Sequence, residues 1–541
     1  MRHTIQAHFP ELLAECRSPL WTAESVVENT LQFGKIQNLR KACHQLHLVE
    51  IPAGETFSFW KQVGKSKSYA GYAKGRELRQ GCLIPSIGGG LCQLSNSLYD
   101  LALKSDCEIV ERHAHSAVVP GSAAEYGRDA TIFWNYVDLR FRPKQGTMIT
   151  AVLTKNELVV RFWGKKRLIS IGGQSAVLQK QSFINTCTDC GVSQCFRHVN
   201  PDIPGFSGRT VFLIEECWPE FEEFSSKIRL QTDDLFLPYH SGLRSIARYN
   251  WNSNGYRRTI AANMKTAFAA ARSRFHLNSS APPVAMQIAR SQALADYYGD
   301  RLPIDASHLY VAQSLLPFLW RRGDLGGRTF SVFMTRLPLQ VLHQKLDRLV
   351  AQFPERKTFQ EFRAPGWIVE AEAEALEQAE RIITSHSLFA SLFPFKTTFL
   401  DWKLPQVKSA ERGLDIVFPG PSLSRKGAFE LREAVQQLHR PLAVLNKAAE
   451  SERFWSGIEL LDIPENWLSR AAVVVQPAFI ENNPRPLLRA LAAGIPVIAT
   501  PECGIAEHPL LTLVPAGDTK TLRDEIQRVT AASEVFAINR G

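Results

Sequence analysis

Short apolar runs, separated by stretches of helical length, dominate the last quarter of this 541-residue chain. Four of them lie at 415–418, 441–445, 472–476 and 496–500. Runs that are apolar throughout, rather than at every second residue, are typical of strands buried on both faces of a parallel sheet. The pattern over 412–530 therefore predicts an α/β region with helices packed on the sheet.

A second set of apolar runs precedes the first and predicts another parallel sheet. The run at 209–214 opens it, and the runs at 284–288, 309–312 and 330–334 continue it. Two such halves facing each other create a cleft at the carboxyl ends of their strands, where open α/β sheets bind their ligands.

The chain divides by pattern into four parts, in keeping with about 150 residues per domain. Mixed helix and strand signals over 1–165 predict an α+β domain, and 166–205 is a short, polar, Cys-rich segment. The two α/β, Rossmann-like halves occupy 206–395 and 396–541. We therefore expect a multidomain protein.

Charge and hydropathy indicate which classes of ligand or partner the chain can bind. A formal net charge of +10 suits an anionic small molecule, and no dense basic run interleaved with aromatics suggests nucleic acid. No stretch reaches the ~18 uninterrupted apolar residues of a membrane span. The first residues, MRHTIQAHFPELLAEC, lack the basic-then-apolar pattern of a signal peptide. We expect a cytoplasmic protein without a membrane span.

The segment GGGLCQLSNSLYDLAL at 88–103 places three glycines before Cys92 and a helical leucine pattern around it. The first turn of a helix favours a thiolate. With His113, His115 and Asp129, Cys92 could form a Cys–His–Asp relay in which one histidine is the base. The alternative is structural, because free cysteine is among the most buried residue types and the glycines then only pack a turn.

A cluster of metal-ligand residue types lies in the Cys-rich segment. Cys187, Cys190, Cys195 and His198 have the spacing C-x2-C-x4-C-x2-H. This set predicts a closed zinc site with a structural role. An iron–sulfur cluster, with Cys217 as a fourth ligand, is the next candidate. A redox-active pair of cysteines and a coincidental polar loop are further alternatives.

Charged side chains follow two of the strands predicted near the C-terminus. Glu481 lies in the loop before a helix that begins near Pro486, and the N-terminus of that helix could hold a phosphate. Arg425 and Lys426 follow the strand at 415–418, where they can neutralise a diphosphate leaving group. Taken singly, each feature is also compatible with a charged surface loop.

Five segments of the first part resemble the VanW family, which is named after a protein of vancomycin-resistance clusters. They are IPAGETFSF at 51–59, GY at 71–72, GGGLCQ at 88–93, ERHAHS at 111–116 and GRDA at 127–130. The resemblance covers roughly residues 30–165. It implies a functional Cys92, since some exported relatives are linked to peptidoglycan cross-linking as L,D-transpeptidases through the matching cysteine. This chain departs from them in showing no export signal.

The last part resembles the donor-binding half of group 1 glycosyltransferases with the GT-B fold. The matching pieces are Lys426 with Gly427, Glu481 in its loop, and ALAAGIPV at 490–497. The segment 379–385 also resembles the end of the family's N-terminal half. The resemblance implies transfer of a sugar from a nucleotide diphosphate donor to an acceptor.

Two positions depart from the glycosyltransferase pattern. Arg489 stands where the family often has a second glutamate that contacts the donor ribose. Pro421 stands where the family has the arginine of a Gly-Arg pair, and Arg425 is a candidate to compensate. Both changes bear on which nucleotide is bound.

Three functions remain open at this point. The first is a glycosyltransferase that holds a nucleotide sugar with Arg425, Lys426 and Glu481 and acts on a cell-envelope or polysaccharide precursor, with a VanW domain of accessory role. The second is a Cys92-dependent transferase acting on a peptidoglycan-related substrate. The third is a non-enzymatic scaffold with a metal-stabilised linker.

Overall fold

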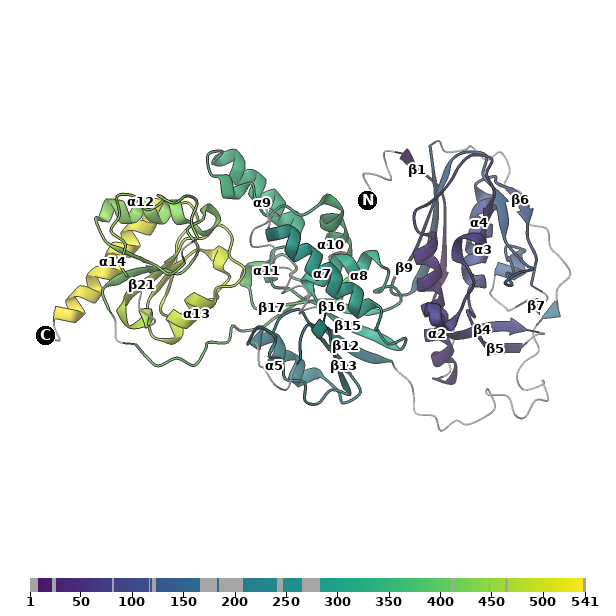
Figure 1. Cartoon of the computed structure of the whole chain (residues 1–541), viewed down its shortest axis with the longest axis horizontal. Helices are drawn as coiled ribbons and strands as arrows, with labels where there is room; N and C mark the ends of the chain where they lie inside the picture. Colours follow the sequence, from purple (N-terminus) through teal and green to yellow (C-terminus); the bar gives the residue numbers. More distant parts are fainter. Residues whose placement is uncertain are drawn as a thin grey trace.

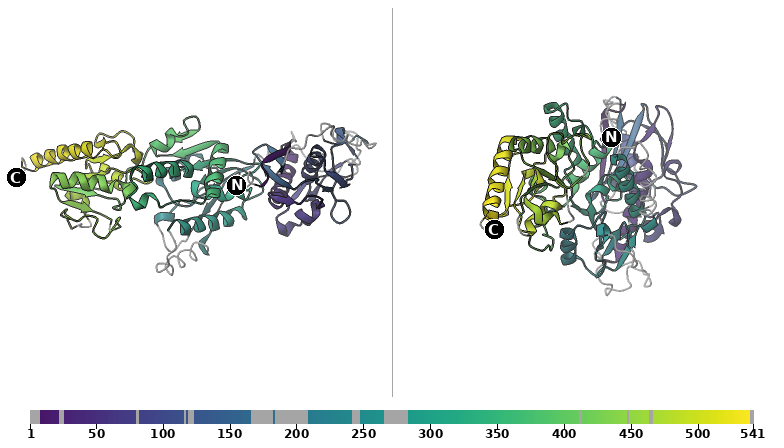
Figure 2. Two further views of the ribbon diagram at one scale, coloured as in Figure 1. Left: turned by 90° about the horizontal axis from the view of Figure 1, so that it is seen from above. Right: turned by 60° about the vertical axis from the view of Figure 1, so that its left-hand side comes forward.

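The computed structural model describes residues 8–21, 26–79, 82–115, 117–118, 123–165, 182–183, 208–240, 247–264, 283–410, 413–446, 448–462 and 466–538. Three bodies lie in a row, with the N-terminal region at one end and the C-terminal half at the other (Figures 1 and 2). Within the described residues, no helix combines the length and apolarity needed to cross a bilayer.

The N-terminal body is built on an antiparallel sheet of four strands in the order β1-β10-β9-β2. Their bounds are β1 Glu11–Pro19, β10 Glu157–Gly164, β9 Thr147–Leu153 and β2 Val49–Ile51. The helices α2 (Val26–Leu46) and α4 (Cys92–Lys104) pack against this sheet. The sequence of β9 is TMITAVL, almost wholly buried, as suits β-branched residues in a strand that packs against a helix.

Smaller β elements complete this body. A three-stranded sheet has the order β3-β8-β6, with β3 Phe57–Ser58, β8 Arg140–Arg142 and β6 Glu108–Glu111. A hairpin pairs β4 (Lys74–Arg79) with β5 (Cys82–Ile87), and β7 (Ala117–Val118) pairs with β11 (Ser182–Phe183). The short helix α3 (Phe59–Val63) follows β3. The region is the α+β domain that the sequence predicts.

The middle body is a parallel sheet of seven strands in the order β14-β13-β12-β15-β16-β17-β18. The strands are β12 Arg209–Leu213, β13 Asp234–Leu237, β14 Arg258–Ala261, β15 Ala306–Ala312, β16 Thr329–Phe333, β17 Arg381–Thr384 and β18 Thr397–Phe399. The first six run 3-2-1-4-5-6 in chain order, which is the doubly wound Rossmann order.

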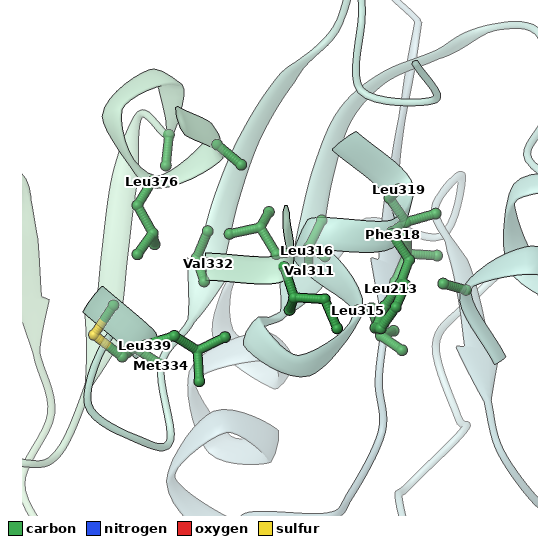
Figure 3. Close-up of a cluster of buried hydrophobic side chains, with 14 of the residues drawn as sticks. Leu213, Val311, Leu315, Leu316, Phe318, Leu319, Val332, Met334, Leu339 and Leu376 are labelled. Carbon is green, nitrogen blue, oxygen red and sulfur yellow. The ribbon is translucent and has the colours of Figure 1, made fainter. Parts of the chain in front are cut away.

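Helices cover both faces of the middle sheet. Val211 and Leu213 of β12 face the core shared with α7 (Pro283–Gly299), α8 (Leu316–Arg321), α9 (Leu339–Gln352) and α10 (Gly366–Gln378). Figure 3 shows part of this core, where Val311 and Val332 of the strands lie near leucines of the helices. Phe212 faces the opposite core, with α5 (Pro219–Ile228). The alternation follows from the two-residue period of a strand.

The prediction of a strand at 284–288 is wrong, because this run begins α7. Its residues Ala285, Met286 and Gln287 are good helix formers. Further along α7, Leu294, Ala295 and Tyr298 recur at helical spacing and are buried. A five-residue apolar run cannot by itself distinguish a strand from the first turns of a buried helix.

The C-terminal body is a parallel sheet of five strands in the order β20-β19-β21-β22-β23. The strands are β19 Asp415–Phe418, β20 Leu442–Val444, β21 Ala471–Gln476, β22 Val497–Ala499 and β23 Leu511–Leu513. Helices α12 (Ala428–Leu438) and α14 (Thr519–Ile538) cover one face, and α13 (Arg485–Ala492) covers the other. All six residues of β21 are buried, as the continuous apolar run predicts. Two Rossmann-like halves therefore follow the α+β domain, and the predicted fold class is confirmed.

Candidate functional sites

The glycine run before Cys92 is explained by close packing. A Cβ on Gly89 would lie 2.5 Å from the Gly75 carbonyl carbon, and one on Gly90 would lie 2.2 Å from Cγ of Lys35. The Asn38 amide of α2 donates to the Gly89 carbonyl oxygen at 2.9 Å. The glycines therefore let the turn approach the β4–β5 hairpin and α2, and this contact fixes where α4 starts.

Cys92 is the first residue of α4 and is half-buried beside the main core of its domain. Its thiol neighbours the imidazole of His115 and helps to raise the pKa of that ring. On the other side of the imidazole, Nδ1 of His115 lies 2.7 Å from Oδ2 of Asp129. The structure thus brings together the thiol, one histidine and the acid of the predicted relay.

Asp129 is the most firmly held residue of this cluster. Its side chain is 0% exposed, and its Oδ2 accepts the backbone N–H of His115 at 2.7 Å. Arg112 donates to Oδ1 of Asp129 at 2.7 Å and to the Asp129 carbonyl oxygen at 2.7 Å. Sequence reasoning missed Arg112, although it lies beside the histidines in the same ERHAHS segment.

The surroundings of His115 raise its pKa. Burial alone lowers the pKa, but the hydrogen bonds to Asp129 and Cys92 and the charges of both outweigh burial and raise it to about 9. His115 is therefore an imidazolium at neutral pH. Such a cation stabilises a neighbouring thiolate and can later give its proton to a leaving group.

His113, the other histidine considered as a base, lies outside this cluster. Its side chain is 51% exposed, with Nε2 3.5 Å from Oε1 of Glu111. The segment after β6 is irregular apart from a bridge between His113 and Thr131, so the two histidines do not share a strand face. Only His115 reaches Cys92 and Asp129.

The predicted zinc ligands Cys187, Cys190, Cys195 and His198 lie outside the described residues. The alternative fourth cluster ligand, Cys217, is half-buried after β12, and burial raises the pKa of its thiol to about 12. Across the ranges that the structure covers, no group of three or more Cys, His, Asp or Glu side chains could hold a metal ion.

The second site lies at the switch point of the C-terminal sheet. Its strands run 2-1-3-4-5 in chain order, so the order reverses between β19 and β21. Ligands of doubly wound sheets bind in the crevice outside this point. Lys426 follows β19 and Glu481 follows β21, and Nζ of Lys426 lies 2.9 Å from Oε2 of Glu481.

The Glu481 carboxylate is held by further donors from its own half. Nε2 of Gln476, the last residue of β21, donates to Oε2 at 2.9 Å. The backbone N–H groups of Asn482 and Asn483 donate to Oε1, both at 3.0 Å. The acid is thereby fixed at the mouth of the crevice with one oxygen turned to Lys426.

The backbone around Lys426 permits this contact. Gly427 has φ +76°, and a Cβ there would lie 1.9 Å from the carbonyl oxygen of Pro477. The carbonyl oxygen of Arg425 accepts the N–H groups of Phe479 and Ile480 at 2.9 and 3.0 Å. Two loops from neighbouring strands are thus tied together. The Arg425 guanidinium lies 3.6 Å from the ring centroid of Phe362, in the middle half.

The start of α13 offers fewer N–H groups than the sequence-based expectation of a phosphate site assumed. Pro486 has no N–H, and the N–H groups of Leu487 and Leu488 already donate to the Pro484 carbonyl oxygen. Arg489, at the position of the family's second glutamate, is exposed on α13. Side chains must therefore supply most of the charge that an anion here needs.

The middle half contributes groups that sequence reasoning missed. Nε2 of His386, after β17, donates to the Glu481 carbonyl oxygen at 2.9 Å. Burial lowers the pKa of His386 to about 4, so the ring is neutral at pH 7. Arg485 of α13 forms a two-pronged ion pair with Glu220 of α5, at 2.8 and 2.5 Å. The crevice is thus closed by contacts between halves.

The first domain is similar in sequence to VanW proteins. Residues 34–163 match the family "VanW like protein". The vancomycin B-type resistance protein VanW of Enterococcus faecalis (strain ATCC 700802 / V583) is 34% identical over 136 residues, which are 25% of this chain and 50% of that protein. YoaR of Bacillus subtilis (strain 168) is 38% identical over 88 residues, 16% of this chain and 28% of YoaR. The chain thus spans half or less of these two relatives.

The last part matches a second family, and solved structures share a low overall similarity with part of the chain. A sucrose-phosphate synthase from Thermosynechococcus elongatus is 14% identical, with a TM-score of 0.37, over 60% of this chain and 90% of that one. Anabaena Alr3699/HepE, solved with UDP and glucose, is 11% identical, with a TM-score of 0.36, over 62% and 95%. Residues 404–531 match the family "Glycosyl transferases group 1". Residues 34–163 are therefore similar to the VanW family, and residues 404–531 are similar to group 1 glycosyltransferases.

Proposed function

We propose that residues 206–541 transfer a sugar from a nucleotide diphosphate donor to a cell-envelope or polysaccharide precursor, with the cytoplasm as the compartment. The VanW domain, within 1–165, has an accessory role in recognising the acceptor or a partner. The observation that carries this proposal is the pairing of Lys426 with Glu481 at 2.9 Å across the β19–β21 switch point.

The chemistry of sugar transfer suits these groups. When the bond between the sugar and the diphosphate breaks, negative charge develops on the leaving phosphate oxygen. The Lys426 ammonium lies at the switch point, where sheets of this kind bind ligands, and can take up that charge. Glu481, fixed by Gln476 and two N–H groups, is positioned to accept hydrogen bonds from sugar hydroxyls. Lys426 exchanges one oxygen of Glu481 for the phosphate when donor binds.

A panel of nucleotide diphosphate sugars tests this proposal. We expect at least one of them to raise the melting temperature of the full chain, because a ligand that binds only the folded state stabilises it. Lys426→Met should remove the shift, while Lys520→Met, on the exposed face of α14, should keep it. If the wild-type chain shows no shift with any donor, the proposal fails.

The Cys92 cluster supports a second function, an acyl transfer on a peptidoglycan-related substrate. The Cys92 sulfur would attack an acyl carbon, and the leaving amine would take the proton of the His115 imidazolium. An incoming amine would then attack the thioester, give its proton back to His115 and release the thiol as thiolate. The specific observation is that Nδ1 of His115 lies 2.7 Å from Oδ2 of Asp129 and that the same ring neighbours the Cys92 thiol.

Trapping of the acyl-enzyme tests the second function. The full chain is incubated with a peptidoglycan-derived peptide and analysed by intact mass spectrometry. An added acyl mass that maps to Cys92 and is lost in Cys92→Ser supports the transferase. If Cys92 remains unmodified after prolonged incubation, this function is excluded and the domain remains an accessory module.

A further inference from the structure

Arg485 occupies an unusual position for a residue of the donor loop. It lies four residues after Glu481, at the first position of α13, yet its guanidinium points into the other half. There it donates to both carboxylate oxygens of Glu220 and lies 5.3 Å from the ring centroids of both Trp218 and Trp402.

Glu220 is fully enclosed at this contact. Its side chain is 0% exposed, and besides Arg485 it accepts the backbone N–H of Lys403 at 2.8 Å. Arg485 keeps 28% of its side chain exposed, so it borders solvent while its partner does not. A buried carboxylate without its cation is strongly unfavourable, so this pair holds the two halves together.

The fork of an arginine fits a phosphate as well as it fits a carboxylate. A diphosphate bound at the switch point of the C-terminal sheet needs such a group. Pro421 removes the arginine expected after β19, and the start of α13 has few free N–H groups because of Pro484 and Pro486. Arg485 is a cation four residues after Glu481, and within the described residues both of its prongs donate to Glu220.

We propose that Arg485 is a diphosphate-binding residue that the donor-free protein keeps paired with Glu220, so that donor binding breaks this one of several contacts between the halves. The inference rests on the proposed glycosyltransferase function and names how its donor site is regulated. The diphosphate and the Glu220 carboxylate compete to bind the Arg485 guanidinium. Once the diphosphate takes Arg485, the crevice opens at α5 and water reaches Glu220.

Calorimetric titration of the full chain with inorganic pyrophosphate and with uridine, adenosine and guanosine diphosphates tests the competition. Glu220→Gln should tighten binding by roughly three- to tenfold, because the competing charge is gone. Arg485→Met, which keeps the apolar stem, should weaken it roughly tenfold or more. The matched control is Glu223→Gln on the same helix, whose carboxylate pairs with Lys227 and Lys403 at the surface and should leave binding unchanged.

The direction of the Glu220→Gln effect separates competition from a purely structural role, which predicts equal or weaker binding. Should that variant fail to fold, Arg485→Lys keeps the cation near Glu220 but loses the fork, and it must still weaken pyrophosphate binding. The inference is overturned if the wild-type chain binds these ligands and Glu220→Gln binds them with equal or lower affinity. It is also overturned if Arg485→Lys binds pyrophosphate as tightly as wild type. In both cases the proposed function is unaffected. If neither wild type nor Glu220→Gln binds any of the four ligands, the proposed function fails and the inference falls with it.

Discussion

The Cys92 cluster and the Glu481 crevice are assembled in different ways. Cys92, Arg112, His115 and Asp129 fall within 38 residues of one domain and need no other part of the molecule. The Glu481 crevice joins two loops of one half and is closed by His386 and Glu220 of the other. The first site is therefore organised by local packing, whereas the geometry of the second depends on how the halves meet.

This difference determines which property a substitution in each site should change. In the Cys92 cluster the buried charges Asp129 and Arg112 compensate each other inside the domain core, so the site and the stability of its domain are linked. In the crevice, polar contacts cross between halves, so ligand binding and domain movement are linked instead. Substitutions should therefore affect folding in the first site and affinity or opening in the second.

The largest expected effect is that of Asp129→Asn. The variant leaves the guanidinium of Arg112, 7% exposed, without its anion and removes the partner of the His115 imidazolium. Breaking a buried pair in this way costs about 3–5 kcal/mol. We expect the unfolding transition of the N-terminal domain to move to much lower denaturant, measured by urea titration with circular dichroism.

Glu108→Gln is the control for that comparison. Glu108 pairs with Arg142 at 2.7 Å, but its side chain is 59% exposed, and exposed pairs contribute about 0–1 kcal/mol. If both variants lose a similar free energy of unfolding, burial is not the reason that the Asp129 pair stabilises the domain.

The next effect is a dependence of stability on pH. Folding raises the pKa of His115 from 6.5 to about 9, so the folded domain binds a proton that the unfolded chain releases between these values. The stabilisation is complete below about pH 6.5 and is lost as the pH rises through 9, with about 3 kcal/mol at stake. Urea titrations from pH 6 to 10 measure it.

His115→Gln should flatten this profile between pH 6.5 and 9, because the glutamine binds no proton. A wild-type-like slope in the variant would show that another group carries the dependence. His386 behaves in the opposite sense. Its pKa is lowered to about 4, so its contribution is present above pH 6.5 and is lost as the pH falls through 4.

A smaller loss is expected for Glu481→Gln. The side chains of Glu481 and Lys426 are 11% and 13% exposed, and the substitution leaves Lys426 without its charged partner. Because Lys426 can still reach the Ile480 carbonyl oxygen at 3.3 Å and some solvent, we expect about 1–3 kcal/mol. Donor affinity should fall as well, measured by calorimetry. If donor affinity is unchanged, Glu481 does not contact the sugar.

The sequence predicts the parts of these sites that depend on neighbours along the chain. The apolar runs locate β19, β21 and β22, and the strand ends then place Lys426 and Glu481 at one edge of a sheet. The thiol, a histidine and an acid were also found from the sequence. The choice between His113 and His115 was not, because it depends on the irregular path after β6 rather than on a strand period.

Contacts between distant segments leave no mark in a single sequence. Glu220 and Arg485 are separated by 265 positions, and nothing in their local patterns indicates a pair. The error at 284–288 has a different cause: the run is too short for its apolar residues to distinguish a strand from the first turns of α7, whose buried residues come later in the helix. Sequence reasoning is thus better suited to the Cys92 cluster than to the closure of the crevice.

The smallest predicted effect, that of His113→Gln, sharpens the comparison within the Cys92 cluster itself. With its ring 51% exposed and only a 3.5 Å contact to Glu111, His113 should contribute within about 0.5 kcal/mol of stability. The rate at which iodoacetamide alkylates Cys92 at pH 7 should also stay at the wild-type value, whereas His115→Gln should slow it by roughly tenfold or more, because it removes the imidazole beside the thiol. Peptide mass mapping distinguishes Cys92 from the other cysteines. Equal slowing by both histidine variants would mean that Cys92 responds to the general charge of the segment, and the cluster of Cys92, His115 and Asp129 would then not be the unit that acts.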